Sequence, residues 1–140
     1  MSPFSQFLHD LRMRRDLRQA ELAESLGYEQ SYISALEIGL KGPPTSEFVE
    51  KLVETLNMSP SEQEQLHAVV CASRRKFAID LDAPLDVYWL LNDLREKMQR
   101  LSPYQVRMIR DILSMQENLL EKRQDPIRRL KRRRKEEAEM

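Results

Sequence analysis

The stretch 18–39 limits most strongly how this chain can fold, and it reads R-Q-A-E-L-A-E-S-L-G-Y-E-Q-S-Y-I-S-A-L-E-I-G. Leu22 and Leu26 lie four residues apart and share one face of a helix. Ala23 beside them is small enough for a second helix to cross closely. Gly27 follows, and a glycine at this place ends a helix in a left-handed conformation at little steric cost. The pattern predicts two short helices joined by a tight turn, with the second ending at the final glycine.

The second predicted helix has a buried stripe and a polar outer face. Ile33 and Leu36 form the stripe. The residues expected to face outward are Glu29, Gln30, Ser31, Ser34 and Ala35. A helix-turn-helix unit presents this outer face to the major groove of DNA. The alternative is two amphipathic helices packed for stability alone, but the glycine turn and the exposed polar run favour a DNA-binding protein over an enzyme.

Composition favours an all-α fold, because only three of the 140 residues are glycine, 6% are aromatic and 33% are charged. Three further helices are predicted around the central pair, at about 5–15, after Pro43 and Pro44, and after the capping box of Ser59 and Glu62. Residues 1–75 are therefore expected to form a five-helix DNA-binding domain. A period of two over 76–83 indicates an extended linker or a short strand.

Residues 84–123 are expected to form a hairpin of two long helices, the second opened by the capping box of Ser102 and Gln105. Its apolar face is wider than one partner helix needs, which favours pairing with a second copy of the chain. The alternative is that the hairpin folds back onto the first domain. The residues expected at the dimer interface are Leu91, Leu94, Met98, Val106, Ile109, Leu113 and Leu120.

Charge is distributed unevenly along a chain of zero net charge. Residues 1–60 hold six Lys and Arg against nine Asp and Glu, a net charge of −3, whereas residues 121–135 hold nine against two, a net charge of +7. The segment 124–140 is expected to be a flexible tail, basic and then acidic. It either attracts nucleic acid without sequence preference or is simply solvated.

Residues 4–58 resemble the helix-turn-helix domain of the Cro/CI (Xre-like) regulator family. The resemblance rests on L-R-Q-A-E-L-A from Leu17 and on G-Y-E-Q-S-Y-I-S-A-L-E from Gly27, followed by Gly39, Lys41 and Pro43. It implies a transcriptional regulator, most commonly a repressor, that binds double-stranded DNA as a homodimer on a palindromic operator. The wide apolar face after residue 84 leaves an alternative, an antitoxin-like module that binds a protein partner and regulates its own gene.

The resemblance implies that nine residues contact DNA: Arg18, Gln19, Glu29, Gln30, Ser31, Tyr32, Ser34, Ala35 and Lys41. Gln30 and Ser31 would face base edges, and glutamine pairs with adenine through two hydrogen bonds. Gln19, Tyr32 and Lys41 would contact the DNA backbone. Glu37 is instead expected to bond within the domain. Arg18 stands where the family usually has Ser or Thr as a helix cap, so that cap is lost and a positive charge is gained.

No catalytic or cofactor motif is present in the sequence, and no metal site is expected, since His9 and His67 have no ligand partners at suitable spacing. Cys71 is the only cysteine, which excludes an internal disulfide and favours a reducing compartment; it is expected to be buried. No signal peptide and no membrane span is expected. Together with the resemblance, the lack of targeting signals implies a bacterial or phage-encoded cytoplasmic protein associated with the nucleoid.

Overall fold

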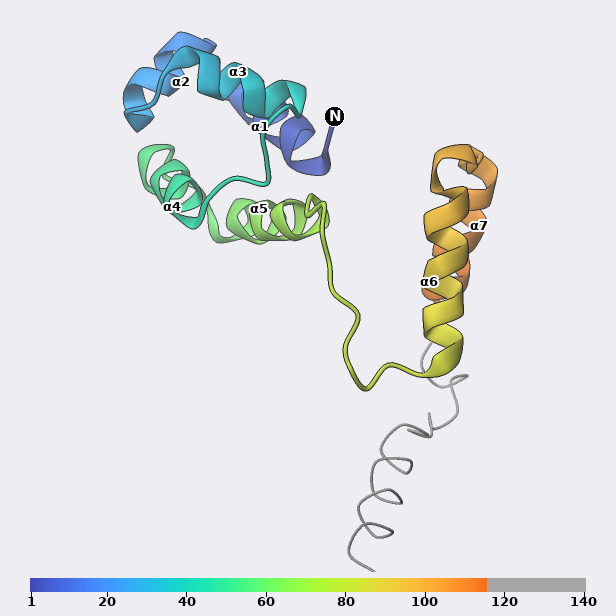
Figure 1. Ribbon diagram of the computed structural model, residues 1–140. Coiled ribbons are helices and arrows are strands. Elements are labelled where there is room, and N and C mark those ends of the chain that lie inside the picture. The colour runs from blue at the N-terminus through green and yellow to red at the C-terminus, as the bar shows by residue number, and fades with distance from the viewer. Residues whose placement is uncertain (116–140) are drawn as a thin grey trace, which may run out of the picture. The chain divides into compact units, whose positions relative to one another are not determined.

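The computed structural model describes residues 1–115, and the chain divides into two units between Phe77 and Ala78. Within these residues the protein has seven α-helices, one short 3-10 helix and no strand (Figure 1). The predicted all-α fold is confirmed. The segment 76–83 contains no strand: residues 76–80 are irregular, and a turn follows in which the Ala83 amide donates to the Asp80 carbonyl at 3.0 Å.

The first unit contains five helices: α1 (Pro3–Arg14), α2 (Gln19–Leu26), α3 (Gln30–Ile38), α4 (Ser46–Thr55) and α5 (Pro60–Ala72). Helix α1 begins two residues earlier than predicted, because Ser2 accepts a hydrogen bond from the Ser5 amide and Pro3 occupies the first helical position. Thr45 caps α4, and the capping box of Ser59 and Glu62 opens α5 as expected.

The core of this unit lies where the five helices meet. Its largest fully buried side chains come from every helix: Phe4, Leu8, Leu11, Leu22, Ile33, Leu36, Phe48, Leu52 and Leu66. Phe4 and Phe48 pack edge to face, with ring centroids 6.3 Å apart. The apolar stripes predicted for α2 and α3 are therefore core-facing, and α3 packs against α1 while α2 packs against α4.

Ser73, just after α5, ties the end of this unit to its beginning. Its hydroxyl accepts a hydrogen bond from the Phe4 amide at 2.9 Å and donates to the Val69 carbonyl at 2.6 Å. Phe4 lies in the first turn of α1, where backbone amides have no partner within the helix. The expectation that Cys71 is buried is wrong. Cys71 is exposed, because α5 directs its Leu66 side to the core and Cys71 lies on another face.

Glycines end both central helices in the left-handed conformation. Gly27 follows α2 with φ +77°, and Gly39 follows α3 with φ +91°. The two sites differ in the space around them. A Cβ on Gly27 would meet nothing within 4 Å, whereas a Cβ on Gly39 would lie 3.3 Å from the Met1 Cα and from the Ser5 hydroxyl oxygen.

Replacing Gly39 with alanine is expected to lower the free energy of unfolding by about 2 kcal/mol, against about 1 kcal/mol for Gly27→Ala. Both variants carry the cost of a left-handed alanine, but only Gly39→Ala also crowds the N-terminus of α1. Urea unfolding of the two proteins measures the difference. Equal losses of unfolding free energy in the two variants would mean that the N-terminus moves away at no cost and does not constrain α3.

The second unit contains α6 (Leu85–Lys97), the 3-10 helix η1 (Met98–Arg100) and α7 (Pro103–Leu113). The predicted capping box of Ser102 and Gln105 opens α7. The expected continuation of α7 to about residue 123 is wrong, because the helix ends at Leu113. Ser114 caps this end, and its amide and its hydroxyl both donate to the Arg110 carbonyl, at 3.0 Å and 2.5 Å. The tail predicted for 124–140 lies outside the described residues.

Candidate nucleic-acid interface

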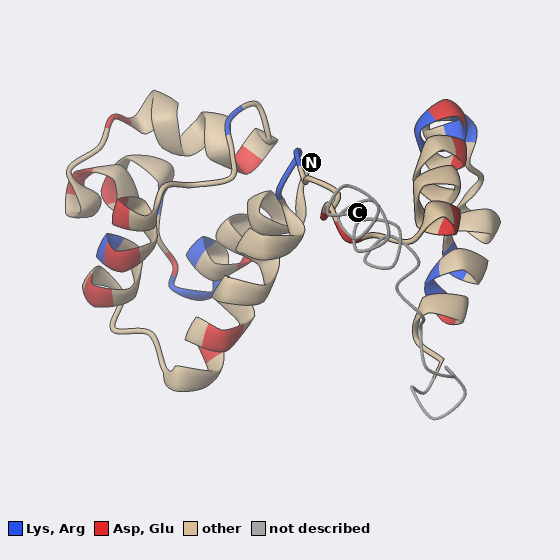
Figure 2. Ribbon diagram, turned by 60° about the horizontal axis from the view of Figure 1, so that its bottom comes forward, with Lys and Arg blue, Asp and Glu red and all other residues tan. Residues whose placement is uncertain are grey.

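Helix α3 offers a neutral polar surface to solvent. Gln30 and Ser31 in its first turn are exposed, and Ser34 and Ala35 one turn later are half-buried. Glu29 precedes the helix without capping it, although the Ser31 hydroxyl lies 3.5 Å from the Glu29 carboxylate. Figure 2 shows the charged residues of the first unit lying mainly on other helices. Amide and hydroxyl groups of this kind are suited to hydrogen bonding with base edges.

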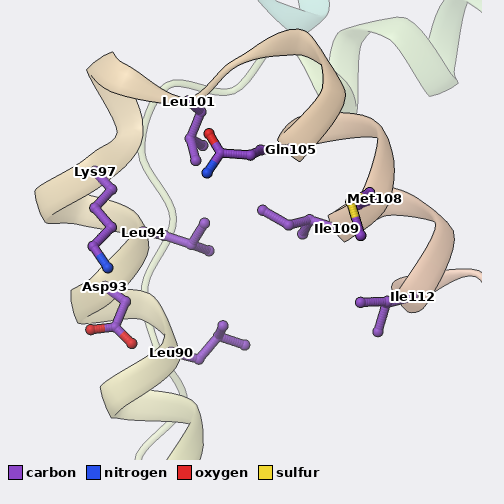
Figure 3. A pocket seen from close by; sticks show the side chains of 9 residues that line it. All are labelled: Leu90, Asp93, Leu94, Lys97, Leu101, Gln105, Met108, Ile109 and Ile112. Carbon is purple, nitrogen blue, oxygen red and sulfur yellow. The ribbon is translucent and has the colours of Figure 1, made fainter.

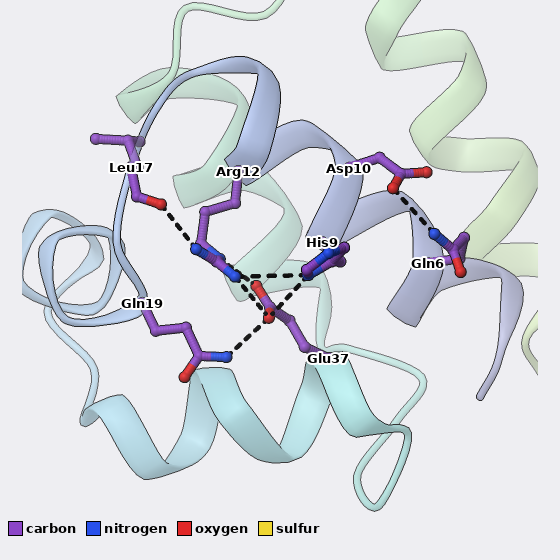
Figure 4. A network of polar contacts seen from close by, with 7 residues as sticks. All are labelled: Gln6, His9, Asp10, Arg12, Leu17, Gln19 and Glu37. Carbon is purple, nitrogen blue, oxygen red and sulfur yellow. Dashed lines mark hydrogen bonds and ion pairs between the residues drawn. The ribbon is translucent and has the colours of Figure 1, made fainter.

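The last turn of α3 is held by a polar network around Glu37, whose carboxylate is only 5% exposed (Figure 4). Arg12 from α1 donates twice to it, from Nε at 2.5 Å and from Nη2 at 3.2 Å. Gln19 from α2 donates to it at 2.8 Å, and His9 Nδ1 lies 3.5 Å away. Three helices thus converge on one carboxylate, and the expectation that Glu37 bonds within the domain describes this geometry.

The network also sets the ionisation of Glu37. Burial acts to raise the pKa of the carboxyl group, but hydrogen bonds from Arg12 and Gln19 and the charge of Arg12 outweigh it and hold the pKa below the ordinary 4.5. A carboxyl group with a lowered pKa in the folded state stabilises the fold above its unfolded pKa. That stabilisation disappears as the pH falls through the folded pKa.

Glu37→Gln is therefore expected to be less stable than the wild type at pH 7, with a gap that narrows as the pH falls below about 4.5 toward 3. Glutamine keeps an acceptor for Arg12 but lacks the charge that strengthens the bond. Urea unfolding of both proteins between pH 7 and pH 3 measures the gap. A gap that stays constant over this range would contradict the lowered pKa.

An aromatic cluster supports the start and the end of α3. Tyr28 and Tyr32 stack with centroids 5.1 Å apart, and both rings pack against Phe48. The exposed Lys41 holds its ammonium group 5.4 Å from the centre of the Tyr32 ring. Lys51 is placed similarly, 5.0 Å from the Tyr28 ring. Burial raises the pKa of the half-buried Tyr32, with a smaller contribution from Tyr28.

The start of α2 carries two predicted contact residues. Arg18 is exposed and makes no cap hydrogen bond, as its departure from the family pattern implied. Its Nε lies 4.0 Å from the Glu21 carboxylate. Gln19 is half-buried and gives one amide hydrogen to Glu37, which leaves the second amide hydrogen of the same group for another acceptor.

Sequence reasoning missed Arg75, which donates from Nη2 to the Gly39 carbonyl at the end of α3. Positive charge is favourable at a helix C-terminus, where carbonyl groups lack partners. The only signal in the sequence is the run S-R-R-K after α5. Periodicity could not show that Arg75 lies beside Gly39, the cap of α3, which is 36 residues earlier in the sequence.

The residues expected at a dimer interface divide into two groups. Leu91, Leu94 and Ile109 are half-buried, whereas Met98, Val106 and Leu113 are exposed. Leu120 lies outside the described residues. None of the residues of α6 and α7 is buried.

Two other kinds of site are absent from residues 1–115. These residues contain no group of three or more His, Cys, Asp or Glu side chains that could hold a metal ion. They also contain no helix that is both long enough and apolar enough to span a membrane.

One family model, described as a helix-turn-helix domain, matches residues 3–66. No curated protein and no solved structure matches the chain. The matched segment runs from the first residue of α1 into α5, so it includes α2, the turn at Gly27 and α3. Residues 3–66 of this protein therefore form a helix-turn-helix domain.

Proposed function

We propose that this protein is a sequence-specific transcriptional regulator, a dimeric repressor that reads a palindromic operator with α3. The observation that carries the proposal is the arrangement of this helix. Glu37 in its last turn bonds to α1 and α2, while Gln30 and Ser31 in its first turn remain exposed. A recognition helix needs this combination, because base contacts discriminate only when the side chains are presented in a fixed orientation.

Base reading is assigned to the exposed side of α3. Gln30 is suited to adenine through N6 and N7, and Ser31 and Ser34 can bond to several bases. Ala35 fits against a thymine methyl group, and Glu29 can accept a hydrogen bond from cytosine N4. These assignments follow the resemblance and the exposed or half-buried state of the five residues.

Phosphate contacts are assigned to the residues around α3. Gln19 offers its second amide hydrogen together with the free amides at the start of α2. Arg18, Lys41 and the Tyr32 hydroxyl flank the base-reading surface, and Arg75 adds a cation at the end of α3. Such contacts set the position on the duplex but do not read sequence.

Dimerisation is proposed because one domain offers little affinity. Its first 60 residues carry a net charge of −3, whereas non-specific attraction to DNA comes from positive charge. Two copies on half-sites about 34–36 Å apart add their contacts, and a two-fold dimer requires a palindromic site. Repression is the usual role of regulators that this domain resembles. Such a protein would act in the cytoplasm, at the nucleoid.

Selection from a pool of random DNA duplexes by the full chain tests this proposal. The expected result is enrichment of one palindromic sequence whose half-sites are one helical turn apart, about 10–10.5 base pairs. A pool that stays random after repeated rounds would overturn sequence-specific reading. An enriched site with a single half-site would overturn the dimeric mode and keep DNA reading.

Lys41→Gln is expected to weaken binding to the selected duplex and to a scrambled duplex by the same factor, because a phosphate contact is independent of sequence. The slope of log affinity against log salt should fall by about 1, since one phosphate per site is no longer neutralised. Lys51→Gln is the matched control, since Lys51 makes the same kind of cation–π contact with Tyr28. Fluorescence anisotropy at several salt concentrations measures both slopes. An unchanged slope for Lys41→Gln would remove Lys41 from the interface.

A further inference from the structure

An apolar groove runs between α6 and α7, with a volume of about 350 Å³. Figure 3 shows Leu90 and Leu94 of α6 pointing toward Ile109 and Ile112 of α7 across it. The apolar side chains that line it are Leu90, Leu94, Leu101, Met108, Ile109 and Ile112. Leu90, Met108 and Ile112 are between 48% and 62% exposed. The two helices therefore leave their shared apolar surface open to water.

Two short helices gain little stability from each other when none of their side chains is buried. Helical stability in proteins comes mainly from packing of an apolar face against a neighbour. Two helical hairpins that meet face to face form a four-helix bundle, in which such faces become the core. The surface therefore fits another helical hairpin of the same kind.

Charge at the edge of the groove shows which hairpin fits. Asp93 and Lys97 of α6 both line it, one helical turn apart, with the apolar Leu94 between them in the sequence. No ion pair found among residues 1–115 joins Asp93 to Lys97. A surface that pairs with its own copy must be self-complementary about a two-fold axis. An acidic and a basic residue one helical turn apart satisfy this condition when the two copies of the helix run antiparallel.

We infer that a second copy of this chain occupies the groove, with the two α6 helices antiparallel and the two-fold axis midway between Asp93 and Lys97. Asp93 of one copy then faces the partner's Lys97, and Lys97 faces the partner's Asp93. The inference deepens the proposed function, because it rests on the dimeric mode and assigns its interface. It places the centre of that interface at the groove. Of the residues expected at the interface, Leu94 and Ile109 line the groove, whereas four others do not: Leu91, Met98, Val106 and Leu113.

Charge reversal in the full chain, without DNA, tests this interface by sedimentation equilibrium. Asp93→Lys and Lys97→Asp each turn two attractions into two repulsions, so each is expected to raise the dimer dissociation constant by about tenfold. Mixing the two variants places lysines opposite aspartates, and the mixture should associate as tightly as the wild type. The double variant Asp93→Lys with Lys97→Asp should also regain wild-type association.

These variants separate pairing between chains from pairing within one helix. Each single variant carries like charges within its own α6, and mixing cannot relieve that repulsion. A mixture no tighter than the separate variants would overturn the inference. So would a wild-type chain that remains monomeric, or single variants that associate as well as the wild type. Because no DNA is present, loss of DNA reading would leave these dissociation constants unchanged, so the two failures are distinguishable.

Discussion

Replacing Gln30 and Ser31 together with alanine lowers affinity for the selected operator by about thirtyfold or more, while affinity for scrambled DNA stays the same. One well-placed bidentate contact to a base contributes about 1–3 kcal/mol of discrimination, and about 2 kcal/mol corresponds to thirtyfold. Both side chains are exposed and neither bonds to the core, so the fold should be retained. Fluorescence anisotropy on the two duplexes, with circular dichroism for the fold, measures the effect.

The matched control replaces Ser61 and Gln65 with alanine. These two residues are exposed on α5, away from α3 in the sequence, and the chemical change is identical. Operator affinity should be the same as that of the wild type. If the α3 variant also bound the operator with wild-type affinity, base reading would have to be reassigned to another surface.

Glu37→Ala lowers the free energy of unfolding by about 3 kcal/mol, the largest stability effect expected of a single substitution outside the apolar core. The change removes the carboxylate that Arg12, Gln19 and His9 all contact. Arg12 is only 12% exposed, so its charge is left without compensation in a poorly solvated place. The estimate is at the low end for a buried pair, because Arg12 still donates to the Leu17 carbonyl.

Two control variants test this stability prediction. Glu24→Ala removes an exposed carboxylate from α2 and should change stability by less than about 0.5 kcal/mol. The double variant Arg12→Met with Glu37→Leu removes both charges and should regain most of the loss. Urea unfolding measures all three proteins. A loss under about 1 kcal/mol for Glu37→Ala would mean that the network does not hold α3 in place.

Local signals in the sequence predicted the central helix pair well. Leu22, Ala23, Leu26 and Gly27 lie within six residues, and their spacing alone specifies a helix, a buried face and a left-handed end. Capping signals worked for α5 and α7 for the same reason. The same Ser-Pro signal at Ser2 sets the start of α1, which the apolar period alone places too late.

Contacts between distant parts of the chain could not be predicted from spacing. The bond from the Phe4 amide to Ser73 spans 69 residues, and the bond from Arg75 to Gly39 spans 36. Glu37 was expected to bond within the domain, but its partners on α1 and α2 become visible only when three helices are packed together. The end of α7 at Leu113 could not be predicted, because the apolar period in the sequence continues past it.

The most direct measurement of the central claim is the affinity ratio of the full chain for the selected operator and for a scrambled duplex of equal length. Fluorescence anisotropy at two salt concentrations gives both affinities. The proposed function predicts a preference of about a thousandfold, near the lower limit for specific DNA-binding proteins, that persists at the higher salt concentration. Equal binding to both duplexes with a steep salt dependence would contradict it, because attraction to phosphates alone behaves in that way.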